Sequence, residues 1–339
     1  MKNPLFKIRE AGKYGFINAE GTVVIEPQYY DAEAFYNNFS RVRFNDKLVP
    51  LDCMGRLLMK HLFNHVGYFE DGLAKVQLVK RWGFIDRRGS LVIDVQYDDA
   101  GDFNQGIAPA SIDGKYGYID KSGEFVIAPT FDTASEFKSD LAAISIDGLH
   151  GFINRKGEII IEPQFESADS FQGDVAVIRA NDKWGIINTK GKLLLEPQFD
   201  VIEGFSEGEF FDGMALVAKD EQYGFINNQG KIVVNTMYDF AGDFGEQMAL
   251  VEINEKFGYI DKDGKLVILP KFEDAGVFSD GLAQVKVKEE WGFIDTDGKF
   301  AIPAHFKDVL PFKSGLAWVA LGDKWAYIDR FGEVVWKEK

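Results

Sequence analysis

Cysteine is almost absent from this sequence of 339 residues, because Cys53 is the only one. A single cysteine cannot close an internal disulfide, so a small disulfide-stabilised scaffold is excluded. Long apolar runs are missing as well. No stretch approaches the roughly 20 residues that a membrane-spanning helix needs, and the first residues lack the apolar segment of a secretory signal. These absences favour a cytoplasmic protein and predict that no membrane is among its partners.

Positive charge is scarce, and so are the motifs of catalysis. The 38 Lys and Arg residues stand against 54 Asp and Glu, a net charge of −16, which argues against a nucleic-acid partner. No nucleophile elbow, phosphate-cradling loop or dinucleotide fingerprint is present. His61 and His65 have a zinc-ligand spacing, but the His-Glu-x-x-His motif is missing. We therefore expect no catalytic residues, no cofactor and no metal.

Glycine and aromatic residues are abundant, and they recur at a fixed period. An aromatic residue, or His in one copy, followed by Gly heads each unit, and the heads are spaced by 34 residues with one interval of 39. Leu48-Val49 and Trp325-Ala326 occupy the same slot in altered form. The regular heads are Tyr14-Gly15, Trp82-Gly83, Tyr116-Gly117, His150-Gly151, Trp184-Gly185, Tyr223-Gly224, Phe257-Gly258 and Trp291-Gly292.

Each unit also carries an Asx-x-x-Gly sequence, such as Asp120 to Gly123, in all ten copies. Between two apolar runs this predicts a hairpin, in which the Asx side chain caps the turn and Gly supplies a positive φ. A Phe follows at a fixed distance in nine copies, for example Phe137, Phe171 and Phe278. We expect these phenylalanines to be buried in equivalent places.

A period of 34 residues also suits helical repeats, but the residue pattern excludes helix. Val23-Val24-Ile25 is a β-branched run, and Ala283 to Lys288 alternates apolar and polar residues as a half-buried strand does. Each unit then contains three strands, and the stretch from Tyr97 to Phe103 has room for a very short fourth. Prolines such as Pro129 recur near the end of the second strand and are expected to end its pairing.

The repeated residues resemble the WG-repeat (KWG-type) family. Lys183-Trp184-Gly185-Ile186-Ile187-Asn188 carries the signature, and the resemblance extends from about Lys13 to the C-terminus. It implies a bacterial β-repeat protein with a propeller-like fold and no general enzymatic activity. The sequence thus predicts an all-β, propeller-like array of tandem hairpin repeats, with an open β-solenoid or spiral as the alternative.

We expect residues 1–339 to form one array of about ten units. Two units depart from the repeat, and irregular places are where function is sought. The second unit, residues 47–80, has lost its aromatic-Gly head. The sixth carries an insertion of five residues near 207–211, which places Phe210 and Phe211 next to each other in a lengthened loop, as a candidate contact point.

The first departure coincides with an inversion of charge. From Arg41 to Arg88 the chain has ten Lys and Arg against five Asp and Glu. This segment predicts a basic patch for an acidic partner, or a degenerate repeat that has drifted. The candidate binding residues are Arg41, Arg43, Arg56, Lys60, His61, His65, Arg87 and Arg88, together with Phe210 and Phe211.

Three function classes remain open at this point. The leading hypothesis is a non-enzymatic scaffold that binds a protein or peptide on one face of the array. Carbohydrate or cell-surface ligand binding is the second, because repeated Trp and Tyr rings stack on sugars. An enzyme with a site in a central channel is the third, supported only by scattered carboxylates.

Overall fold

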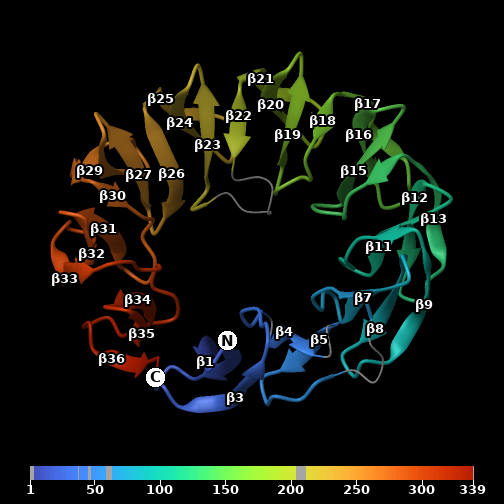
Figure 1. Ribbon diagram of the computed structural model, residues 1–339. Coiled ribbons are helices and arrows are strands. Elements are labelled where there is room, and N and C mark those ends of the chain that lie inside the picture. Colours follow the sequence, from blue (N-terminus) through green and yellow to red (C-terminus); the bar gives the residue numbers. More distant parts are fainter. Residues whose placement is uncertain (1–3, 37, 45–46, 59–62, 204–210, 339) are drawn as a thin grey trace. The chain divides into compact units, whose positions relative to one another are not determined.

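The computed structural model describes residues 4–36, 38–44, 47–58, 63–203 and 211–338, and every regular element in them is a β-strand (Figure 1). The chain divides into two compact units, Met1–Gly173 and Asp174–Lys339. Within each unit, small antiparallel sheets follow one another in chain order. The expectation of an all-β protein built from tandem hairpins is confirmed.

The first unit contains eighteen strands. They pair in the orders β1-β2-β3, β4-β5, β6-β7-β8-β9, β10-β11-β12-β13 and β14-β15-β16-β17. Their bounds are β1 (Phe6–Glu10), β2 (Lys13–Ile17), β3 (Val23–Tyr29), β4 (Phe39–Phe44), β5 (Lys47–Asp52), β6 (His65–Val66), β7 (Leu73–Leu78), β8 (Arg81–Asp86), β9 (Leu91–Tyr97), β10 (Asp99–Ala100), β11 (Ile107–Ile112), β12 (Lys115–Asp120), β13 (Phe125–Phe131), β14 (Thr133–Ala134), β15 (Leu141–Ile146), β16 (Leu149–Asn154), β17 (Ile159–Phe165) and β18 (Ser167–Ala168).

The second unit is built in the same way. Its strands pair in the orders β19-β20-β21, β22-β23-β24-β25, β26-β27-β28-β29, β30-β31-β32-β33 and β34-β35-β36. Their bounds are β19 (Val175–Ala180), β20 (Lys183–Asn188), β21 (Leu193–Phe199), β22 (Val201–Glu203), β23 (Met214–Lys219), β24 (Gln222–Asn227), β25 (Ile232–Tyr238), β26 (Phe240–Gly245), β27 (Met248–Ile253), β28 (Lys256–Asp261), β29 (Leu266–Phe272), β30 (Asp274–Ala275), β31 (Ala283–Val287), β32 (Glu290–Ile294), β33 (Phe300–Phe306), β34 (Ala317–Leu321), β35 (Lys324–Ile328) and β36 (Val334–Lys337).

Two different turns connect the long strands of a sheet, as β11, β12 and β13 show. Between β12 and β13 the amide of Gly123 donates to the carbonyl of Asp120 at 3.0 Å, and the Asp120 carboxylate accepts the amide of Ser122 at 2.8 Å. This confirms the predicted Asx turn. Between β11 and β12, Asp113 and Gly114 both have positive φ, 52° and 75°, as a two-residue type I′ hairpin requires.

The glycine after each head aromatic is needed because the facing strand bulges over it. In the sheet of β26 to β29, Phe257 lies opposite Phe272 but Tyr259 lies opposite Ile268, so three residues of β29 face the single residue Gly258. A Cβ on Gly258 would be 2.5 Å from the Ile268 carbonyl oxygen.

The recurring proline sits inside this bulge, as Pro270 does within β29. The expectation that proline ends pairing there is therefore wrong, because the strand resumes its ladder beyond it. A bulge leaves some backbone amides outside the ladder, so a residue without an N–H is tolerated at that place.

The core consists of small clusters between successive sheets. Tyr118 of β12 meets Phe137, which precedes β15, with ring centroids 4.7 Å apart, and both side chains are buried. Phe137, Phe171 and Phe278 are exposed by only 1%, 0% and 2%, so their equivalent burial is confirmed. Within each unit, successive sheets cover one another's apolar faces, which is the construction of a propeller-like array. Closure into a ring or an open spiral stays a prediction.

Candidate functional site

One position of the first long strand in each sheet changes character along the first unit. It holds Arg41 in β4 and Lys75 in β7, but Pro109 in β11 and Ala143 in β15. The four are equivalent by register, because each lies opposite the residue two places after the head slot, for example Lys75 opposite Phe84. Of these four sheets, only the two that contain β4 and β7 carry a cation at this position.

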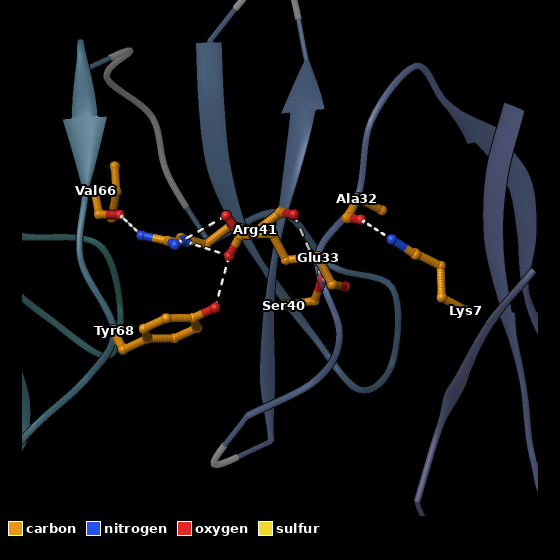
Figure 2. A network of polar contacts seen from close by, with 7 residues as sticks. All are labelled: Lys7, Ala32, Glu33, Ser40, Arg41, Val66 and Tyr68. Atoms are coloured by element: carbon orange, nitrogen blue, oxygen red, sulfur yellow. Dashed lines mark hydrogen bonds and ion pairs between the residues drawn. The ribbon is translucent and has the colours of Figure 1, made fainter. Parts of the chain in front are cut away.

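Arg41 is the centre of a polar network (Figure 2). Its guanidinium forms a two-pronged ion pair with the Glu33 carboxylate, one arm measuring 2.8 Å, and donates to the carbonyl of Val66 at 2.8 Å. Its Cζ lies 4.2 Å from the ring centroid of Tyr68, whose hydroxyl donates to Glu33 at 2.7 Å. The Arg41 side chain is only 17% exposed. Such a fork on a carboxylate fixes the orientation of both groups.

Smaller contacts extend this arrangement over the neighbouring strands. Lys7 donates from Nζ to the carbonyl of Ala32 at 2.9 Å, and the hydroxyl of Ser40 donates to the backbone carbonyl of Glu33 at 2.8 Å (Figure 2). Burial alone would raise the pKa of Glu33, but the hydrogen bonds from Arg41 and Tyr68 and the Arg41 charge hold it below its ordinary value. The carboxylate therefore stays ionised.

The line of charged groups continues onto the following sheets. Lys75 Nζ lies 3.1 Å from a carboxylate oxygen of Asp102, and the backbone amide of Asp102 donates to Glu136 at 3.1 Å. His65 of β6 packs edge-on against Trp82, with centroids 5.3 Å apart. Burial, together with the charges of Arg41 and Lys75, lowers the pKa of His65. This imidazole is therefore neutral near neutral pH.

A ring at the border of the network is open to solvent. Tyr36 is 51% exposed and meets Tyr68 edge to face with ring centroids 5.2 Å apart. Tyr68 itself takes the place that Asp102 and Glu136 hold in the following copies. Glu33, Tyr36, Arg41 and Tyr68, which we call the Arg41 surface, thus combine an oriented ion pair with an exposed aromatic pair. Such a combination is suited to binding rather than to proton transfer.

The structure places the predicted basic residues in two groups rather than in one patch. Arg56 follows Asp52, to which its Nε donates at 2.6 Å, and its side chain is 70% exposed. Arg87 stands over the rings of Phe39 and Phe69 at 5.0 and 5.5 Å.

Phe39 pairs with Asp52, so Arg56 and Arg87 lie at the end of the sheets that carries the Asx turns. The exposed Arg88 belongs to the same turn as Arg87. Arg43 lies opposite Leu48, at the other end of the β4-β5 pair.

Three of the candidate residues, Lys60, His61 and Phe210, lie outside the described residues. Phe211 is 41% exposed and forms an isolated bridge with Met214. Within the described part of the chain, no group of three or more His, Cys, Asp or Glu is placed to hold a metal ion. The described part of the chain also contains no helix that is long and apolar enough to cross a membrane.

Sequence reasoning did not single out Glu33, Tyr36, Tyr68, Lys75 or Asp102. The sequence signal that could have revealed them lies in a position-by-position comparison of the copies. Such a comparison shows a cation where the later copies of the first unit carry Pro109 or Ala143.

The model of the family described as "WG containing repeat" matches eight segments of the chain: residues 14–47, 82–116, 116–149, 151–184, 184–222, 223–257, 257–290 and 291–325. The segment between the first two matches contains most of the second copy, whose head is Leu48-Val49. No curated protein matches the sequence.

Solved structures resemble the fold at low sequence identity. A crystal structure of a eukaryotic initiation factor aligns over 100% of this chain and 96% of its own, with a TM-score of 0.59 and 11% identity. The extracellular domain of a one-component system from B. thetaiotaomicron aligns over 98% and 65% (TM-score 0.33, 8% identity). PorZ, a surface component of the type-IX secretion system of Porphyromonas gingivalis, aligns over 99% and 52% (TM-score 0.32, 10% identity). Of these three, only the initiation factor is similar enough to support the fold, and at 11% identity it supports the fold alone.

Proposed function

We propose that this chain, which belongs to the WG containing repeat family, is a non-enzymatic scaffold that binds a protein or peptide partner through the Arg41 surface. The partner proposed is neither nucleic acid nor a membrane, because a net charge of −16 repels phosphate groups.

The observation that carries this proposal is the Arg41 surface itself. Pro109 and Ala143 fill the equivalent position in later sheets of the same unit, so folding of a sheet does not require a cation there. A half-buried ion pair is also a weak source of stability, because removing both charges from water offsets most of their attraction. The presence of the Arg41–Glu33 ion pair beside the Tyr36 and Tyr68 rings therefore supports a role in recognition.

Tyrosine and arginine are, with tryptophan, the residue types enriched among those that contribute most binding energy at protein interfaces. Here the guanidinium is already oriented by donating to the Val66 carbonyl, and the carboxylate by accepting from the Tyr68 hydroxyl. A partner that packs on Tyr36 would therefore meet a surface that loses little conformational freedom on binding.

The test begins with capture of partners from the native lysate by the tagged full chain. Binding of a captured partner is then measured for Tyr36→Ser and for Tyr30→Ser, a matched change at a tyrosine that follows β3 and is 74% exposed. We expect Tyr36→Ser to weaken binding about tenfold or more, as loss of an interface tyrosine does, and Tyr30→Ser to leave it unchanged. Equal binding by both variants would refute the site.

A second candidate, carbohydrate binding, is favoured by one observation. The head aromatics, including Trp82, Trp184 and Trp291, are only half-buried and stand at the border of the core clusters. Half-open rings at regular intervals suit a chain of sugar units. Quenching or enhancement of tryptophan fluorescence by an oligosaccharide, with no change on adding peptide, would favour this second function over the first.

A further inference from the structure

A row of four side chains crosses each complete sheet at the end that carries the type I′ hairpins. In the β26-β27-β28-β29 sheet this row is Phe240, Glu252, Phe257 and Phe272, each directly opposite the next. In the β30-β31-β32-β33 sheet the corresponding residues begin with Asp274, Lys286 and Trp291. The second position of the row therefore differs in charge between the two sheets.

In two sheets, a cation at this second position lies over the head ring of its own sheet. Lys286 Nζ is 5.9 Å from the ring centroid of Trp291, and Arg9 Cζ is 5.4 Å from that of Tyr14. These are cation–π contacts, in which a positive group is attracted by the electron-rich face of an aromatic ring. In the β26 to β29 sheet the second position is Glu252, so no cation is supplied from within that row.

The first position of the same row is also unusual. Phe240 stands where the sister sheets carry Asp99, Thr133 and Asp274, and it is 40% exposed. Its ring centroid lies 5.8 Å from that of Tyr223 and 6.1 Å from that of Phe257. Three aromatic rings therefore stand in contact at this end of the second unit, one of them open to solvent.

Glu252 lies between two of these rings. It is half-buried, and its carboxylate makes no hydrogen bond or ion pair with any residue that the structure describes. Asp239, Glu255 and Lys256 are exposed close by, Asp239 accepting the amide of Asn254 at 3.2 Å, so carboxylates outnumber cations around Glu252. An uncompensated carboxylate beside aromatic faces is complementary to a positive group.

We propose that Tyr223, Phe240, Glu252 and Phe257 form a binding site for an arginine side chain of a partner peptide. This proposal rests on the proposed peptide-binding function and adds to it a second site with a defined chemistry. A guanidinium can stack on one ring while two of its N–H groups donate to the carboxylate. An apolar side chain would instead strip water from Glu252 without replacing its hydrogen bonds.

The first unit shows the same chemistry satisfied from within the chain. Arg41 stacks on Tyr68 at 4.2 Å and forms its two-pronged ion pair with Glu33. The rings and carboxylate around Phe240 resemble the Tyr68 and Glu33 half of that arrangement with the arginine left out. For this reason we commit to arginine rather than lysine, whose ammonium neither stacks as a plane nor forks onto a carboxylate.

The experiment uses the full chain and a capped peptide, Gly-Ser-Gly-Arg-Gly-Ser-Gly, titrated by ligand-observed NMR at about 0.15 M salt, where surface charges are screened beyond roughly 8 Å. Matched peptides carry citrulline or lysine in place of arginine. Glu252→Gln and Phe240→Thr are the test variants, the latter because Thr133 fills that position in a sister sheet. Glu255→Gln is the control, since it removes the same charge from the same hairpin.

We expect saturable binding of the arginine peptide, and binding about five- to tenfold weaker for citrulline or for either test variant, as loss of a cation–π contact or a charged hydrogen bond implies. The control is expected to change affinity less than about twofold. Equal loss in Glu255→Gln and Glu252→Gln would reduce the effect to net charge and overturn the proposal, and so would equal binding of the citrulline peptide.

Tighter binding of the lysine peptide would overturn the assignment to arginine. Failure of this test is separable from failure of the proposed function, because the Tyr36→Ser experiment measures binding at a site in the first unit only. Unchanged far-ultraviolet circular dichroism would show that the variants are folded.

Discussion

Replacement of Gly258 by alanine is the most direct test of why the repeat needs a glycine after its head aromatic. The added Cβ would lie 2.5 Å from the Ile268 carbonyl oxygen and 2.7 Å from the Pro270 nitrogen. Both are backbone atoms of the facing strand, so neither can rotate away as the end of a side chain does. The bulge in β29 must therefore shift, or the pairing between β28 and β29 must open.

Overpacking of this kind costs about 1–3 kcal/mol, and the loss of glycine's freedom in the unfolded chain returns at most about 1 kcal/mol. We expect a net destabilisation near 2 kcal/mol, which for a unit of this size lowers the melting temperature by roughly 4–8 °C. Urea unfolding followed by circular dichroism would measure it.

The matched control is Gly242→Ala in the same sheet. A Cβ at Gly242 would meet only the Leu250 side chain, at 3.6 Å, and sister copies carry Ser135 and Asp169 at this position. We expect its effect to stay within about 0.5 kcal/mol. Comparable loss in both variants, or none in Gly258→Ala, would refute the bulge as the reason for the glycine.

Two copies depart from glycine in this slot, with Val49 and Ala326. In the last sheet the slot holds Ala326, and there β36 has no bulge opposite it, because Ala326 pairs with Lys337 and Tyr327 with Trp336 in unbroken register. Alanine is therefore tolerated in this slot where the facing strand does not bulge over it.

The remaining predictions concern the core, the titration of a head residue and the basic segment. Truncation of Phe137 or Phe278 to Ala is expected to cost about 3–5 kcal/mol, and a change near zero at both in chemical denaturation would mean that the repeat register is wrong. Burial lowers the pKa of His150 below 6.5 in the folded protein, so the unfolded chain takes up the proton first, and stability should fall as pH drops below about 6.5. His150→Phe should flatten that fall in urea titrations between pH 7 and 5, and an unchanged slope would contradict the burial. Reversal of Arg56 and Lys60 to Glu should slow association with an acidic partner in stopped-flow mixing, less so above about 0.15 M salt; unchanged rates with every partner found would make this segment a drifted repeat.

Local features of the fold followed directly from the sequence. The Asx-x-x-Gly turns form in all ten copies, with the Gly amide donating to the Asx carbonyl, because turn chemistry depends on four adjacent residues. Burial of Phe137 and Phe278 followed from the 34-residue period, since identical positions of identical units meet identical surroundings. The recurring proline was wrongly predicted to end strand pairing, because a proline inside a bulge and a proline at a strand end have the same sequence signal.

The candidate sites depended on contacts that the period does not encode. Tyr68 meets Glu33 across 35 residues, and Phe240 meets Tyr223 and Phe257 from different strands. The basic segment looked continuous in sequence, but the register of β4 and β5 separates Arg43 from Arg56.

The sequence by itself determined the strands, their turns and the residues that each unit buries, because these depend on neighbours within one hairpin. Tertiary structure alone decided which charges are neutralised, as Arg41 is by Glu33, and which remain open, as Glu252 does. The physical reason is that side chains from successive sheets meet only after the sheets have packed, and the outcome then depends on the reach and charge of each individual side chain.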